Sequence, residues 1–125
     1  IEKRLENLAS KKKQTQKEIY RRINTAKEYL EANLDQSVNL DTLSKVAALS
    51  PFHLLRSFKK VYSLTPHQYL TQKRVERSRF LLKDSHQSIS EIAENVGFQS
   101  QSAFGRLFKQ VEGQSPQVYR ERFYR

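Results

Sequence analysis

The chain has 125 residues and a formal net charge of +10, because 23 lysines and arginines outnumber 13 aspartates and glutamates. So large a positive charge on one small domain favours a polyanionic partner, with nucleic acid ahead of an anionic membrane surface. The absence of cysteine excludes disulfides and cysteine-based metal or thiol sites, and no apolar run approaches the roughly 20 residues that span a bilayer.

The first segment of the chain, residues 1–16, has apolar residues at helical spacing followed by the polar run KKKQTQK. We interpret it as a linker stub or frayed helix end from a missing N-terminal region, since the chain begins at Ile1 and contains no methionine. A firmer helical pattern starts near residue 17 and predicts a helix over residues 17–33. Its apolar face carries Ile19, Ile23, Ala26 and Leu30.

Capping signals divide the rest of the chain into short helices. A capping residue followed by proline marks three helix starts, at Ser50-Pro51, Thr65-Pro66 and Ser115-Pro116. Capping residues without a following proline mark two more, at Asn39 and Ser88. No stretch alternates with a period of two, so the predicted fold class is all-α with about seven helices. The predicted helices span residues 17–33, 40–47, 51–61, 66–84, 89–95, 101–111 and 116–122.

A repeat is the strongest feature of the sequence. The stretch SPFHLLRSFKKVYSLTPHQY, residues 50–69, recurs as SQSAFGRLFKQVEGQSPQVY, residues 100–119. Each copy combines a short helix, a tight turn and a second helix, which is the outline of a helix-turn-helix motif. We expect the second helices to be anchored in the core by Leu54, Phe58 and Val61 in one copy and by Phe104, Phe108 and Val111 in the other.

The opposite face of each second helix carries basic, amide and hydroxyl groups that suit the major groove of DNA. An ordinary solvated face is the alternative, but its recurrence at the same offset in so basic a chain favours DNA. The candidate DNA-binding residues are Pro51, Phe52, Leu55, Arg56, Lys59 and Lys60 in the first copy, and Ser100, Gln101, Ser102, Gly105, Arg106 and Lys109 in the second.

The segment IAENVGFQSQSAFGRLFKQVEGQSPQVYR, residues 92–120, resembles the signature of AraC/XylS-type bacterial transcription regulators. The matching elements include Gly97-Phe98, Phe108-Lys109 and Ser115-Pro116. The resemblance covers about residues 20–122, with Ser78 standing where the family usually has alanine. It implies two helix-turn-helix subdomains joined by a long linker helix. We therefore expect subdomains over residues 17–65 and 85–125 and a linker helix over residues 66–84.

This resemblance implies sequence-specific binding of double-stranded DNA by a cytoplasmic transcription regulator. The expected partners are DNA, RNA polymerase, and an effector molecule or a dimerisation partner that acts through the missing N-terminal region. No cofactor, no metal and no membrane contact are expected.

A 19-residue linker helix would span about 28 Å, close to the 34–36 Å of one DNA turn. We therefore expect helices 51–61 and 101–111 to read successive major grooves of an asymmetric site.

Other classes of function fit parts of the sequence less well. An enzyme is not supported, because His53, His67 and His86 are scattered and there is no glycine-rich phosphate loop. A non-specific architectural or RNA-binding module would share the positive charge, but the chain lacks an exposed aromatic platform for stacking on unpaired bases. A membrane-surface helix remains the third alternative.

Overall fold

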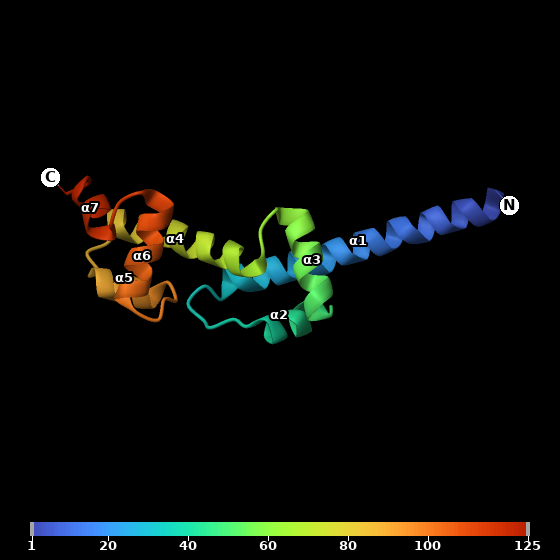
Figure 1. Ribbon diagram of the computed structural model, residues 1–125, viewed down its shortest axis with the longest axis horizontal. Coiled ribbons are helices and arrows are strands. Elements are labelled where there is room, and N and C mark those ends of the chain that lie inside the picture. The colour runs from blue at the N-terminus through green and yellow to red at the C-terminus, as the bar shows by residue number, and fades with distance from the viewer. Residues whose placement is uncertain (1, 125) are drawn as a thin grey trace. The chain divides into compact units, whose positions relative to one another are not determined.

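The computed structural model describes residues 2–124, and over this range it contains seven α-helices and no strand (Figure 1). The prediction of an all-α fold is confirmed. The helices are α1 (Glu2–Ala32), α2 (Leu40–Ala47), α3 (Pro51–Tyr62), α4 (Pro66–Asp84), α5 (Ile89–Asn95), α6 (Gln101–Glu112) and α7 (Pro116–Glu121). From α2 onward, every bound agrees with the sequence prediction to within one residue.

Helix α1 differs from its prediction, because it begins at Glu2 rather than near residue 17. Residues 2–18 are all exposed, and packing starts only at the half-buried Ile19. The polar run KKKQTQK interrupts the apolar spacing of the first residues, so continuous periodicity located only the packed part of this helix. The run KKKQTQK contains neither glycine nor proline and therefore does not interrupt the helix.

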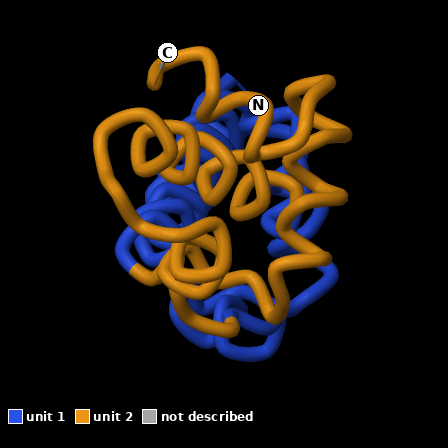
Figure 2. Tube along the Cα trace, turned by 90° about the vertical axis from the view of Figure 1, so that its left-hand side faces the viewer, with its two compact units in different colours: residues 1–32, 38–67 blue, residues 33–37, 68–125 orange. Residues whose placement is uncertain are grey.

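The chain divides into two compact units (Figure 2). Unit 1 comprises residues 1–32 and 38–67 and contains α1, α2 and α3. Its core is formed by Ile23, Ala26, Leu30, Leu43, Ala47, Leu54 and Phe58. Unit 2 comprises residues 33–37 and 68–125. The subdomain boundaries expected from the resemblance stay a prediction.

Unit 2 has an aromatic core built on α4, α5 and α6. The buried residues are Val75, Leu81, Leu82, Ile92, Ala93, Val96, Phe104 and Phe108, with Phe98 and Tyr119 packed against them. The Phe98 and Phe104 ring centroids lie 5.2 Å apart, and those of Phe108 and Tyr119 lie 5.4 Å apart. These aromatic contacts tie the turn before α6 and helix α7 to α6 itself.

The repeat extends further than the sequence showed, because the long helices that precede the two motifs are packed alike. In α1 the buried residues are Ile23, Ala26 and Leu30, and in α4 Val75, Ser78 and Leu82 are buried at matching positions, each 52 residues later. Each motif therefore rests on an equivalent long helix. The fully buried Ser78 donates its hydroxyl to the carbonyl oxygen of Val75 at 2.6 Å, so serine is accommodated there without an unpaired polar group.

Two of the predicted core anchors are exposed instead. Val61 is 37% exposed and Val111 is 48% exposed, whereas Leu54 and Phe58 are fully buried. Val61 does share a helical face with Leu54, but it follows seven residues later and therefore lies about 10 Å further along the axis. At that distance the valine lies past the end of the core, and Val111 occupies the matching position of the second copy.

The turns of the two copies share a left-handed backbone but not their residue types. The residue after α2 is Ala48 with φ of 53°, and the residue after α3 is Ser63 with φ of 63°. The second copy has glycines in these places, Gly97 with φ of 94° and Gly113 with φ of 81°. The glycines differ in their surroundings: a Cβ at Gly97 would collide with the carbonyl oxygen of Leu34, and one at Gly113 would meet nothing within 4 Å.

We predict that Gly97→Ala destabilises the protein by about 2–4 kcal/mol, since left-handed strain adds to a backbone collision. Gly113→Ala is the matched control and should cost about 1 kcal/mol or less, because strain alone acts there and alanine restricts the unfolded chain. Urea unfolding of both variants measures the two losses. Equal losses would show that the close approach at Gly97 does not exist.

Candidate nucleic-acid interface

Helices α3 and α6 each turn one face into a core and the opposite face to solvent. Leu54 and Phe58 anchor α3, and Phe104 and Phe108 anchor α6, and all four are fully buried. Along both helices, burial follows the same order position by position, with one exception. Leu55 is 38% exposed, whereas Gly105 at the matching position is half-buried because it has no side chain to project.

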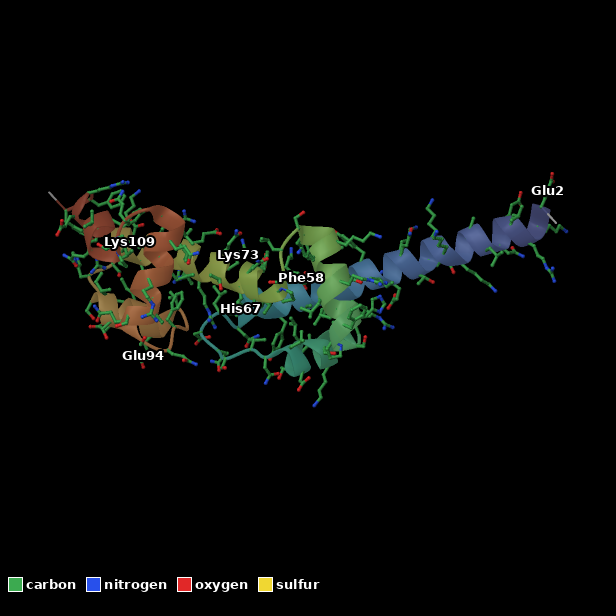
Figure 3. All side chains as sticks on the ribbon, viewed as in Figure 1. Glu2, Phe58, His67, Lys73, Glu94 and Lys109 are labelled. Carbon is green, nitrogen blue, oxygen red and sulfur yellow. The ribbon has the colours of Figure 1, made fainter. Side chains whose placement is uncertain are left out.

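The predicted DNA-binding residues lie on these solvent faces. All six candidates of the first copy are exposed, and in the second copy all are exposed except Gly105. Figure 3 labels Phe58 on the buried face of α3 and Lys109 on the exposed face of α6. Ser100 also caps α6, since its hydroxyl oxygen accepts the N–H of Ala103 at 3.0 Å. That these residues bind DNA stays a prediction.

The solvent face of α3 carries a stacked pair that its counterpart lacks. The guanidinium of Arg56 lies 5.6 Å from the ring centroid of Phe52, a ring that is itself 71% exposed. This cation–π contact limits the directions in which Arg56 can point. At the matching position of α6, Ser102 offers no ring to Arg106. The two faces therefore have the same layout and different chemistry.

The last residue of α3 contacts α1, and the last residue of α6 contacts α4. Tyr62 donates its hydroxyl to Asn24 Oδ1 at 3.4 Å, and Lys27 Nζ lies 5.8 Å from the Tyr62 ring centroid. Burial raises the pKa of the Tyr62 phenol, and the nearby Tyr20, Glu31 and Glu28 add to this rise.

The matching contact in the second copy is ionic. Glu112 Oε1 lies 2.6 Å from Nη1 of Arg79, which occupies on α4 the place that Lys27 has on α1. Sequence reasoning missed both contacts, although Tyr62 and Glu112 stand at equivalent positions of the repeat.

Arg74 on α4 holds residues 33–37 and the turn before α6. Its Nε donates to the carbonyl oxygen of Leu34 at 2.8 Å, and its Nη2 donates to that of Gln36 at 2.8 Å. The same guanidinium lies 5.9 Å from the ring centroid of Phe98. Burial lowers the pKa of Arg74 while Asp35 acts to raise it, and an arginine so placed remains a cation.

Arg120 on α7 donates to carbonyl oxygens in the last turn of α4 and in the segment that follows it. Its Nε donates to Leu82 at 3.0 Å and its Nη1 donates to Gln87 at 2.5 Å, while Leu81 and Ser85 accept more weakly from Nη2 at 3.4 and 3.3 Å. The last carbonyls of a helix have no partner within the helix, and here a side chain from another helix supplies one. Arg120 thus has a structural task, distinct from the exposed cations of α6.

Within residues 2–124 no group of three histidines or carboxylates could hold a metal ion. In the same range, no helix is both long and apolar enough to cross a bilayer.

The chain matches a known protein family and known proteins. A family model described as a helix-turn-helix domain matches residues 43–122. The chain is 34% identical over 91 residues to the probable transcriptional regulator LumQ of Photobacterium leiognathi, which covers 73% of this chain and 37% of LumQ. The chain therefore spans about a third of the length of that relative.

Two solved structures resemble the fold closely. The C-terminal domain of AraT, a response regulator from Geobacillus stearothermophilus, has a TM-score of 0.77 at 31% identity, covering 80% of this chain and 84% of that one. The DNA-binding domain of the transcriptional factor AdpA, solved in complex with a target DNA, has a TM-score of 0.78 at 28% identity, covering 81% and 91%.

We predict that Arg120→Lys destabilises the protein by about 2–3 kcal/mol, because a lysine keeps the charge but loses the planar fork that reaches several carbonyls. Arg106→Lys, on an exposed face, should change stability by less than about 0.5 kcal/mol. Thermal or urea unfolding compares the two. Should the Arg120 variant be as stable as the Arg106 variant, the carbonyl contacts contribute nothing.

Proposed function

We propose that this chain, which belongs to the AraC/XylS-type helix-turn-helix family, binds double-stranded DNA as the recognition domain of a bacterial transcription regulator. The observation that carries the proposal is the recurrence of one exposed, cation-bearing face on α3 and α6, each anchored by the same two buried positions. A helix with such a face fits the major groove, where side chains reach base edges.

The charges on the two faces support contacts to both phosphates and bases. Helix α3 carries Arg56, Lys59 and Lys60 and no carboxylate. On α6, Arg106 and Lys109 are exposed, and the carboxylate of Glu112 is already paired with Arg79. Arginine can donate two hydrogen bonds to guanine, whereas lysine acts on phosphate as a point charge. We therefore assign base reading to Arg56 and Arg106, and mainly phosphate contacts to the lysines.

Helix α4 supports the proposal that both motifs act on one site. It is unbroken over its 19 residues, from Pro66 to Asp84, which corresponds to about 28 Å. We propose that it sets the spacing of two half-sites in successive major grooves. Because Phe52 and Leu55 correspond to Ser102 and Gly105, the two half-sites should differ in sequence, and the whole site should be asymmetric.

The partners of the whole protein are also proposals, because the chain spans about a third of its relative LumQ. They comprise RNA polymerase and an effector molecule or dimerisation partner acting through a further region. A cytoplasmic location is proposed on the same basis.

The assignment of the two arginines is tested on a site selected from a random pool of duplexes. We predict that Arg106→Ala weakens binding by about 1–3 kcal/mol and relaxes preference in one half of the site, and that Arg56→Ala does so in the other half. Repeating the selection with each variant measures the base preference in each half of the site. If a variant binds all sequences more weakly by the same factor, the substituted arginine contacts a phosphate. The assignment of that arginine as a base reader is then wrong.

The spacing proposal is tested by changing the DNA and leaving the protein intact. Inserting about five base pairs between the half-sites moves one of them to the opposite side of the duplex. We predict that affinity then falls toward the non-specific level, a loss of about 10³ or more. A control insertion of the same length outside the site should have no effect. Unchanged affinity after the central insertion would show that the motifs are flexibly joined or do not both read DNA.

A further inference from the structure

A hollow of about 520 Å³ lies between α1 and α3 in unit 1. Its lining residues are Gln16, Ile19, Tyr20, His53, Arg56, Ser57, Lys60 and Val61. The volume lies within the range of about 300–1,000 Å³ that is typical of small-molecule sites. The α1 wall is formed by Gln16, Ile19 and Tyr20, and α1 continues beyond them to Glu2, which is labelled at its end in Figure 3.

The chemistry of the lining is that of a site for an anion with an apolar body. Ile19, Tyr20 and Val61 supply apolar surface, and Val61 is exposed here although it shares a helical face with the core. Arg56 and Lys60 supply positive charge. No carboxylate belongs to the lining, and among the ion pairs of the described residues none involves either cation. A bound anion would therefore not have to displace a carboxylate from either cation.

We propose that this hollow binds a small amphipathic anion, an apolar ring system or chain bearing a single carboxylate or sulfonate. The anionic group pairs with Arg56 and Lys60, and the apolar body lies on Ile19 and Val61. Charge-assisted hydrogen bonds and apolar burial then act together, which neither a simple inorganic anion nor a neutral hydrocarbon can achieve.

Occupancy of the hollow has a consequence for DNA. Arg56 and Lys60 are also the cations that we assign to the first reading helix, and this step rests on the proposed function. A cation paired with the ligand cannot also contact a base or a phosphate, so the ligand and DNA compete. The hollow is thus an inhibitory site within the DNA-binding surface itself.

The binding step is tested without DNA, using 8-anilino-1-naphthalenesulfonate and its neutral analogue N-phenyl-1-naphthylamine as fluorescent probes. The sulfonate should bind the intact chain more tightly than the neutral analogue does. Lys60→Gln should weaken sulfonate binding about ten-fold, while Lys59→Gln, a neighbouring cation outside the hollow, should leave it unchanged. Val61→Trp fills the hollow and should abolish binding. If the two lysine variants lose sulfonate affinity equally, or if the Val61 variant binds the sulfonate as the intact chain does, the proposed site is wrong.

The competition step uses the selected duplex. A probe concentration ten times its own Kd should raise the apparent Kd for DNA about ten-fold in the intact chain, and should leave the Val61→Trp variant unaffected. If the probe binds and DNA affinity does not change, the inhibitory role is wrong although the site is real. Failure of the chain to bind any duplex specifically would instead contradict the proposed function and leave the probe result standing.

Discussion

Short helices impose one requirement on this protein, which is that the many backbone groups at their ends must find partners. Ser50, Ser88, Ser100 and Ser115 accept backbone N–H groups where helices begin. Guanidinium groups donate to carbonyls where helices end or turn, as Arg120 does for α4. These bonds fix the first and last residue of each helix. Because a helix boundary also sets which residues face outward, the exposed faces of α3 and α6 depend on them.

The two copies satisfy this requirement with matching residues, such as Ser50 and Ser100 where the helices begin, although their turn residues and outer faces differ. Each motif rests on a long helix, and three buried residues recur at matching positions in the two long helices. An arginine from that long helix then reaches the turn: Arg22 donates to the carbonyl oxygen of Ala48 at 2.8 Å in unit 1, and Arg74 lies against Gly97 and Phe98 in unit 2. The backbone plan is thus shared while the turn residues and outer faces are not.

Local signals explain which parts of the fold could be predicted from the sequence. A capping side chain bonds a backbone group only three residues away, so caps and Ser-Pro pairs located α2 to α7 correctly. The repeat identified the two exposed faces. The full extent of α1 was missed because the polar run KKKQTQK interrupts the apolar spacing of the first residues. The bonds of Arg74 and Arg120 join residues 33 to 40 positions apart, and only the folded chain brings them together. The hollow beside α3 also joins residues far apart in the sequence, such as Ile19 of α1 and Lys60 of α3, and only the folded chain brings them together.

The stack of Arg56 on Phe52 makes one reading face stiffer than the other. A side chain already confined by a neighbouring ring surrenders less rotamer freedom when it reaches an acceptor. Arg106, beside Ser102, has no ring to confine it and must give up more. A contact made by Arg56 therefore costs less conformational entropy. Arg106 can instead adopt several directions, so the two helices present the same cation with different freedom of movement.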